Sequence, residues 1–572
     1  MAKIKSNQAY ASVHLDKFSG IGPGILSRDG RAYDMENFRI LPDGSLKKRT
    51  GYYRQRQYPN RVRAFWEGTA GGINYAFIVC HNVVYRADRV IGGPIQIDTL
   101  TTTGGKVNFF VYRDTIYLQD GAGLRAYDAV TNKFPAVEGY VPLYGKNWDP
   151  KNGGSVYEPM NLLTNRLRVS YANTTLQTDF MLPFYTQSVE SVRVNGRRIN
   201  DYIFATGAKN LVIPAASTGY TVEIAMTASM AEEEAGINTT ECACVYGGRH
   251  HETLCLFNGD TPTALYFSSD VPRNELSAVR ADYPKSLPLY FKERNVLHSS
   301  NRTDPIHSMV AYGNQLIGYS YRTSWSIRCP DDAGDTCTLS VLLPDIGCDS
   351  TEAAILCDYK PVTVNQKGIF LLDLPRSEND LPRAVRISDP IADRLTTSLL
   401  TSAITYENRE HHELWVRDPN DADGRVLVYN YDLGQWYTFT GFHADHFVSY
   451  PDFQGFLDND TLYLLSNELY SDSGEHVTAL YQSGYLSFGH PEEQKRSLRA
   501  TLCCQTAGSA AYLKLESENG EYTVPHLLTL PGPPQIVDRR ALLGRFRHLR
   551  FRILVSGSED CRIFSLSLHA NL

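Results

Sequence analysis

The sequence predicts an all-β protein, and three observations lead to this prediction. Short apolar and aromatic runs alternate with turn signals along most of the 572 residues. Tyrosine is unusually common, with 36 residues, and tyrosine is enriched in strands. The 43 glycines and 28 prolines are spread along the chain, as many tight turns require. Helix-like pieces are confined to short stretches near residues 230–235 and 390–400.

The clearest strand pattern lies in residues 304–327. Residues 306–312 form a first apolar strand, Gly313-Asn314 a turn, and residues 316–321 a second strand. A second turn follows, and Trp325 begins a third strand. Strand, turn, strand, turn, strand is a meander. One meander cannot bury both of its faces, so neighbours of the same kind are expected.

Further meanders follow from the same pattern. They begin near residues 64, 107, 243, 361, 403 and 447. The total is about seven units, mostly about 40–60 residues apart, which is the period of four-stranded propeller blades. We therefore predict a β-propeller of about six to seven blades. Its first blades are expected in residues 61–140 and the remaining blades in residues 236–479, and an early strand is expected to complete the last blade.

Three other regions flank or interrupt the predicted propeller. Residues 1–60 form an arm with a hairpin. Residues 141–235 are predicted as an inserted β domain that begins with a linker at 142–159, and its Asn195-Gly196 is the strongest short hairpin signal in the chain. Residues 480–572 alternate apolar and polar positions, which predicts a small β-sandwich.

Two basic stretches are candidate binding surfaces. The first belongs to the N-terminal hairpin, which turns at Pro42-Asp43-Gly44, and the second lies near the C-terminus. Each is either a solvated face or a contact to a neighbouring subunit or an acidic partner, where arginine is favoured. The candidate partner-binding residues are Asn37, Phe38, Lys47, Lys48 and Arg49 in the first stretch, and Arg545, Arg547, Arg550 and Arg552 in the second.

Composition restricts the classes of function. The formal net charge is −7 with mixed signs, so no basic stripe indicates tight nucleic-acid binding. No secretory h-region and no apolar run of membrane-spanning length is present. The 11 cysteines are irregularly spaced, which favours reduced, mostly buried thiols. Cys329 with Cys337, and Cys348 with Cys357, stay open as disulfides or metal ligands.

No catalytic site is predicted, and neither a metal nor a cofactor is expected. The chain has no G-x-S-x-G, H-E-x-x-H, phosphate-binding or dinucleotide-binding motif. His250-His251 and His411-His412 are adjacent pairs, and adjacent strand residues point to opposite faces. The acidic residues at 232–234 are interpreted as a solvated turn or short helix, and residues 418–424 as a polar hairpin loop, because the ligand spacing of a calcium loop is missing.

Several motifs, taken in their order along the chain, resemble those of one protein family. The N-terminal pattern F-S-G … N-F-x-I-L-P-D-G-S-L-x-x-R-x-G is similar to the opening of tail nozzle, or tail hub, proteins of tailed bacteriophages. The matching residues here are Phe18, Ser19, Gly20, Asn37, Phe38, Leu41, Pro42, Gly44, Arg49 and Gly51. Later pieces that resemble the same proteins are at residues 266–269, 305–306, 316–317, 325–327, 346–348, 368–370, 387–391, 426–432 and 435–439. Together these cover about two-thirds of the chain.

The resemblance implies a structural virion protein made in the host cytoplasm. Members form a ring, typically a hexamer, at the end of the tail tube or below the portal and adaptor. The ring continues the channel through which double-stranded DNA is ejected, and it docks fibres or other tail proteins. The residues that line the channel are not identified, and acidic side chains there would repel phosphate. Two alternatives stay open: a glycan-binding or glycan-cleaving propeller, and a receptor-binding or fibre-attachment protein.

Overall fold

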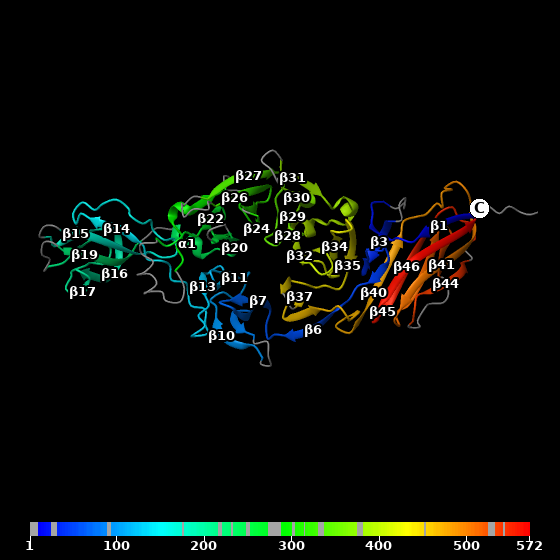
Figure 1. Ribbon diagram of the computed structural model, residues 1–572, viewed down its shortest axis with the longest axis horizontal. Coiled ribbons are helices and arrows are strands. Elements are labelled where there is room, and N and C mark those ends of the chain that lie inside the picture. The colour runs from blue at the N-terminus through cyan, green and yellow to red at the C-terminus, as the bar shows by residue number, and fades with distance from the viewer. Residues whose placement is uncertain are drawn as a thin grey trace, which may run out of the picture. The chain divides into compact units, whose positions relative to one another are not determined.

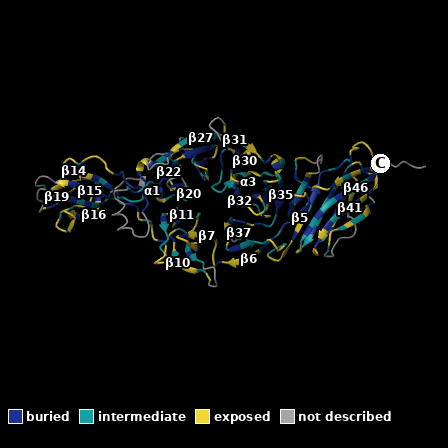
Figure 2. Cartoon of the chain, viewed as in Figure 1, coloured by how far each residue is buried: buried dark blue, intermediate teal, exposed yellow. Residues whose placement is uncertain are grey.

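The protein is mostly β, with 59% of its residues in strands and 4% in helices (Figure 1). The all-β prediction is therefore confirmed at this level. The computed structural model describes residues 10–24, 31–87, 93–173, 177–214, 220–229, 233–247, 252–272, 288–299, 304–313, 315–329, 337–374, 381–450, 453–523, 532–541 and 544–572. The strands form many small sheets, and buried residues alternate with exposed ones along several of them (Figure 2).

The chain divides into two compact units. Unit 1 combines Met1–Val62 with Cys348–Leu572, and unit 2 is Arg63–Gly347. Unit 1 is therefore built from both ends of the chain. The five predicted domain ranges do not follow this division, and they stay predictions.

Unit 2 contains four small antiparallel sheets with meander connections. The predicted meanders near residues 64, 107, 243 and 304 are all found, and most have a fourth strand. The first two are β7 (Val62–Ala70), β8 (Ile73–Cys80), β9 (Val83–Arg86) and β10 (Ile95–Thr99), then β11 (Asn108–Tyr112), β12 (Thr115–Gln119) and β13 (Leu124–Ala126). The other two are β20 (Cys242–Gly247), β21 (Glu252–Phe257), β22 (Ala264–Phe267) and β23 (Val296–His298), then β24 (Ser308–Tyr312), β25 (Gln315–Tyr319), β26 (Thr323–Arg328) and β27 (Thr338–Pro344).

A six-stranded sheet interrupts these meanders, in the region of the predicted insertion. It consists of β14 (Leu143–Trp148), β15 (Arg166–Asn173), β16 (Asp179–Val194), β17 (Arg197–Ile199), β18 (Ala208–Val212) and β19 (Tyr220–Ala228). Asn195 and Gly196 have φ of 50° and 78°, so the predicted hairpin turn is found. The predicted linker at 142–159 is wrong in part. It contains β14, which pairs in parallel with β15 and places Trp148 in the core of this sheet.

Three more meanders lie in unit 1. They are β28 (Ala354–Cys357), β29 (Lys360–Asn365), β30 (Gly368–Asp373) and β31 (Arg383–Arg386), then β32 (Ile404–Asn408), β33 (Glu413–Arg417), β34 (Val426–Asn430) and β35 (Gln435–Phe439), then β36 (His446–Tyr450), β37 (Phe453–Asp458) and β38 (Thr461–Leu465). The early strand β6 (Tyr52–Gln57) pairs with β38 and gives the last meander its fourth strand. The expected completion by an early strand is thus found.

Strand pairing also joins two of these meanders, which the sequence did not predict. β35 pairs in parallel with β3 (Arg31–Glu36), β3 pairs with β40 (Glu475–Ser483), and β39 (Ser471–Asp472) connects β40 to β6. The result is an eleven-stranded, nearly closed, barrel-like sheet. No propeller is detected in the described residues, which form small sheets and this barrel-like sheet.

The C-terminal strands are divided between two sheets. One contains β1 (Tyr10–Leu15), β4 (Phe38–Ile40), β5 (Leu46–Lys48), β41 (Arg496–Thr506), β44 (Gln535–Ala541) and β46 (Cys561–Asn571). In the other, β40 pairs with β45 (Leu549–Gly557), β45 pairs with β42 (Ala510–Ser517), and β42 pairs with β43 (Gly520–Thr523). The strand β2 (Ser19–Ile21) pairs with β3. N-terminal strands are therefore built into both sheets.

Helices are short in the described part of the chain. They are α1 (Glu233–Asn238), α3 (Thr397–Ser402) and two 3-10 segments, η1 (Glu293–Asn295) and η2 (Asp389–Arg394). The positions of α1, η2 and α3 agree with the two helix-like stretches seen in the sequence, whereas η1 was not predicted. No helix among the described residues is long and apolar enough to cross a membrane.

Eight of the eleven cysteines are buried. Burial raises the pKa of Cys80, Cys244, Cys357 and Cys504 to about 12. The Sγ atoms of Cys329 and Cys337 lie 2.6 Å apart at the ends of β26 and β27. Of the two cysteine pairs left open by the sequence, this one is brought into contact.

Candidate functional site

The N-terminal hairpin forms as predicted, and it lies inside unit 1. β4 pairs with β5, and the turn between them is closed by Asp43, whose Oδ1 accepts hydrogen bonds from the Ser45 backbone N–H at 3.1 Å and from its hydroxyl at 2.7 Å. Gly44 has φ of 83°, and a Cβ there would lie 2.8–2.9 Å from atoms of Lys17. The turn therefore requires glycine for its conformation and for its close packing.

The basic residues of this hairpin are not an exposed tip. Lys48 and Arg49 are each 1% exposed, Asn37 and Phe38 are also buried, and Lys47 is half-buried. The reason is that β46 pairs with β5, so C-terminal strands cover the segment. A solvated face is therefore wrong for Lys48 and Arg49, whereas Lys47 keeps part of its side chain in solvent.

Arg49 is the centre of a buried polar cluster. Its guanidinium donates to both carboxylate oxygens of Asp472, at 2.8 and 2.5 Å. Its Nε donates to Asn37 Oδ1 at 2.7 Å, and its Nη2 donates to the Thr440 carbonyl at 2.7 Å. The same Arg49 guanidinium lies 4.6 Å from the ring centroid of Phe442. The planar guanidinium of arginine can donate to several acceptors at once in this geometry, which a lysine ammonium cannot do.

Asn37 extends the cluster to two further segments. Its Nδ2 donates to Thr440 Oγ1 and to the Thr478 carbonyl, both at 2.8 Å, and its Oδ1 also accepts from the Thr440 N–H at 3.0 Å. Its φ is 57°, a conformation that asparagine tolerates better than most residues. Asn37 and Arg49, matched residues of the N-terminal motif, thus link β3 to the segments after β35 and in β40.

Lys48 is held by backbone oxygens. Its ammonium donates to the carbonyls of Tyr470 at 3.2 Å and Glu559 at 3.4 Å, and also to that of Gly557. Burial lowers the pKa of Lys48 to about 8. The residue therefore connects the hairpin to the turn between β45 and β46 and is a structural cation.

A second buried cation, Arg39, pairs with Glu413 of β33. Their atoms meet at 2.7 Å (Nε to Oε1) and 3.3 Å (Nη2 to Oε2), and Glu413 also accepts from Trp415 Nε1 at 2.9 Å and the Tyr437 hydroxyl at 2.7 Å. Burial opposes both charges, but the ion pair outweighs it: Arg39 lowers the pKa of Glu413, and Glu413 raises the pKa of Arg39. Both groups are charged in the folded protein.

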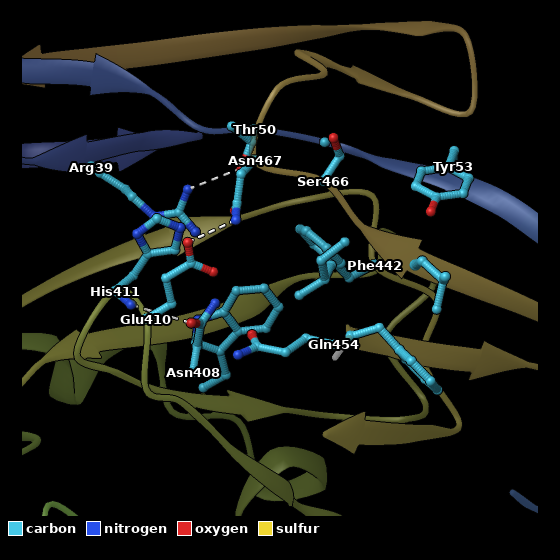
Figure 3. Close-up of a pocket in the computed structure, with 15 residues that line it drawn as sticks. Arg39, Thr50, Tyr53, Asn408, Glu410, His411, Phe442, Gln454, Ser466 and Asn467 are labelled. Carbon is cyan, nitrogen blue, oxygen red and sulfur yellow. Dashed lines mark hydrogen bonds between the residues drawn. The ribbon is translucent and has the colours of Figure 1, made fainter. Parts of the chain in front are cut away.

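A pocket of about 240 Å³ opens next to this pair (Figure 3). The N-terminal segment contributes Arg39, Thr50 and Tyr53, and the meanders contribute the opposite wall. Figure 3 shows Arg39 and His411 on one side and Gln454 and Phe442 below Ser466. The remaining lining residues are Gly51, Asn408, Glu410, Trp415, Phe453, Leu464, Leu465 and Asn467.

The pocket walls are partly ordered by their own hydrogen bonds. Asn467 Nδ2 donates to Glu410 Oε1 at 2.7 Å, and the Tyr406 hydroxyl donates to Gln454 Oε1 at 2.9 Å. Asn408 Oδ1 accepts the His411 backbone N–H at 3.3 Å. Three side-chain amides and one carboxylate of the lining are therefore held in place by their neighbours.

His411 gives unit 1 a predicted acid sensitivity. Burial, and then the charge of Arg39, lowers the pKa of His411 to about 4 from an ordinary value of 6.5. Between these pH values the unfolded chain binds more protons than the folded one, so stability falls as the pH falls. We expect His411 to cause about 2 kcal/mol of the stability that the wild type loses between pH 7 and pH 5, and this part of the loss should be absent in His411→Gln.

Urea denaturation of both proteins at the two pH values measures this difference. His412→Gln is the matched control, because His412 is exposed and adjacent. Equal acid sensitivity of wild type and His411→Gln would show that His411 does not carry the effect.

The C-terminal arginines separate into two pairs. Arg550 forms a bidentate contact with Glu516 across β42 and β45, at 2.8 and 2.6 Å, and Arg552 contacts Glu521 at 2.8 Å. Arg545 and Arg547 precede β45, and both are exposed. The structure therefore satisfies Arg550 and Arg552 within the chain, while Arg545 and Arg547 remain on the surface.

The sequence did not identify Glu413, Asp472, Asn408 or Gln454 as parts of a site. A weak signal existed only for Glu413, a charged residue at the head of the apolar run L-W-V in β33. The partners of Arg39 and Arg49 lie hundreds of residues away, and spacing in one sequence carries no record of such contacts. No group of three or more potential metal ligands occurs in the described ranges, and His250-His251 lie outside them.

Comparison with known proteins adds little to this mostly β class. No family model matches the chain, and no curated protein matches it. Among solved structures, it is similar to the extracellular domain of a putative one-component system, BT4673, from B. thetaiotaomicron, at 12% identity. The match covers 77% of this chain and spans 57% of that chain's length, with a TM-score of 0.20. At this TM-score the likeness identifies neither a shared fold nor a shared function.

Proposed function

We propose that the protein is a structural subunit of a bacteriophage tail, in the ring that forms the tail nozzle or hub. The observation that supports this proposal is the role of the N-terminal motif. Asn37 accepts a hydrogen bond from Arg49, Arg49 pairs with Asp472, and Gly51 lies in close contact with Ser471 of the same segment. Residues that the resemblance joins in sequence are thus joined in space, as a motif that determines a fold requires.

The β-propeller, with its inserted β domain and C-terminal β-sandwich, is part of the same proposal. A propeller of six or seven blades requires small antiparallel meanders, and seven such units, β7–β10, β11–β13, β20–β23, β24–β27, β28–β31, β32–β35 and β36–β38 with β6, occur in the described residues. The inserted β domain corresponds to β14–β19, and the C-terminal sandwich to the two sheets that contain β41–β46. An experimental structure that shows unclosed meanders would contradict the propeller.

The expected assembly is a ring of identical subunits that continues the DNA channel and docks portal, adaptor, fibre or tail-tip proteins. Arg545 and Arg547 are the exposed members of the predicted partner surface, and arginine is favoured at interfaces. We expect the Arg545→Glu/Arg547→Glu variant to weaken ring formation. Lys514→Glu, a single charge reversal on β42, is the control.

Mass photometry of the full chain, alone and co-expressed with the neighbouring tail proteins, tests the assembly. The expected species is a closed ring, typically of six copies, visible in negative-stain images. A chain that stays a 64.2 kDa monomer under both conditions would overturn the proposal and favour a glycan-active protein. A trimer would favour the receptor-binding or fibre-attachment alternative.

A further inference from the structure

The pocket beside Arg39 has a size and a position that suit a small ligand. Its volume of about 240 Å³ is far more than a single water molecule needs. A space of this size accommodates one sugar ring with its hydroxyl groups. The walls come from β4–β6 on one side and from the turns of two meanders on the other, so the pocket is a feature of the fold and not of a single loop.

The polar groups of the pocket combine donors and acceptors. Gln454 and Asn408 each use the side-chain oxygen in a hydrogen bond, so the amide nitrogen is left for a ligand among the contacts of the described residues. Asn467 uses its nitrogen and Glu410 one oxygen, so an amide oxygen and a carboxylate oxygen are left. A hydroxyl group both donates and accepts, and several hydroxyls on one ring match such a mixture.

The charges of the pocket disfavour an anion. Arg39 is neutralised by Glu413, which is fully buried behind it. His411 is neutral at pH 7, because burial and Arg39 lower its pKa to about 4. Among the described lining residues, Glu410 therefore carries the charge that is not compensated. A phosphate or carboxylate ligand would meet a negative site, whereas an uncharged ligand would not.

Aromatic side chains complete the lining. Tyr53 is 39% exposed and Phe453 is half-buried, whereas Trp415 and Phe442 are each only 1% exposed and offer a ligand almost no surface. Pockets that bind small molecules characteristically combine aromatic walls with a few oriented polar groups. The C–H face of a pyranose is apolar and its rim is polar, which corresponds to this division.

We propose that this pocket binds a single neutral sugar ring, held by Asn408, Glu410, Gln454 and Asn467. The site binds and does not cleave. A glycosidase needs two carboxyl groups that flank the bond, and among the described lining residues Glu410 is the one carboxylate. The inference goes beyond the proposed tail function and does not depend on ring formation.

Saturation-transfer difference NMR on the full chain tests the proposal, with D-glucose, D-galactose and N-acetyl-D-glucosamine as probes. We expect at least one sugar to bind, and we expect glucose 6-phosphate to bind at least tenfold more weakly than glucose if glucose is the ligand. Gln454→Ala and Asn467→Ala are each expected to weaken binding about tenfold, the effect of one lost hydrogen bond of about 1.4 kcal/mol. Gln366→Ala, an exposed amide elsewhere in unit 1, is the control and should bind as wild type does.

The outcomes separate clearly. No saturation transfer from any of the three sugars at 50 mM would overturn the proposal. Binding that is unchanged in both pocket variants would also overturn it, because the sugar would then lie elsewhere. If Gln454→Ala does not fold, Asn467→Ser provides the same test, since serine keeps a small polar group at the pocket edge. A monomeric protein that binds sugar would contradict the ring and leave this inference intact.

Discussion

Replacing Arg39 with methionine is expected to destabilise unit 1 by about 3–5 kcal/mol, because Glu413 would remain buried without its cationic partner. Glu413 would still accept hydrogen bonds from Trp415 and Tyr437, but these do not replace a bidentate charge. Guanidinium denaturation monitored by hydrogen exchange in β32–β35 peptides measures the loss in the relevant unit.

The matched control is Arg499→Met. Arg499 makes the same kind of bidentate contact with Asp538, at 2.7 and 2.8 Å from its Nε, but its side chain is 61% exposed. Exposed ion pairs contribute little to stability, because solvent screens them, so this variant should differ little from wild type. The double variant Arg39→Met/Glu413→Gln should recover part of the loss, because the uncompensated charge is removed. Equal losses for Arg39→Met and Arg499→Met would contradict the argument from burial.

Gly51→Ala is expected to be the second severe change, at about 3 kcal/mol or more, since overpacking against a rigid backbone is destabilising. A Cβ on Gly51 would lie 2.0 Å from the carbonyl oxygen of Ser471 and 2.5 Å from its carbon. The chain at Gly51 also donates to the Leu469 carbonyl at 2.7 Å and accepts from the Ser466 N–H at 3.0 Å. Moving either segment would break these bonds and disturb Asp472, the partner of Arg49.

Denaturation and hydrogen exchange of the segment around residues 466–472 measure this effect. Gly532→Ala is the control, because the nearest atom to its added Cβ would be the flexible Gln535 Nε2 at 3.6 Å. If Gly51→Ala unfolds at the same denaturant concentration as Gly532→Ala, the close contact at Ser471 does not constrain the fold.

Local pattern was enough to predict the elements. The meanders near residues 64, 107, 243 and 304 were predicted, as were the turns at Asn195-Gly196 and Asp43-Gly44, because alternation and turn chemistry act over a few residues. The exceptions are informative. β14 was missed because the segment that contains it, residues 142–159, is rich in glycine, asparagine, proline and aspartate and resembles a linker. It is a strand because β15 provides a partner and the core accepts Trp148.

Burial of charge was the main feature that the sequence concealed. Lys48 and Arg49 look like a surface segment, and only the long-range strands that cover them make them internal. The pocket was equally hidden, because Arg39, His411 and Gln454 come from three distant segments. An acidic residue inside an apolar run, such as Glu413, is the kind of signal that can indicate a buried ion pair.

The sequence alone determined that this protein is built from strands, where most of them lie and which turns connect them. These properties depend on side chains within a few positions of one another. The tertiary structure decided which strands become neighbours, including the joining of β3, β6 and β40 into one nearly closed sheet. It also decided that Asn37 and Arg49 of the N-terminal motif are buried and connect distant strands. Both depend on contacts between residues hundreds of positions apart, whose energies arise only when the chain ends meet in unit 1.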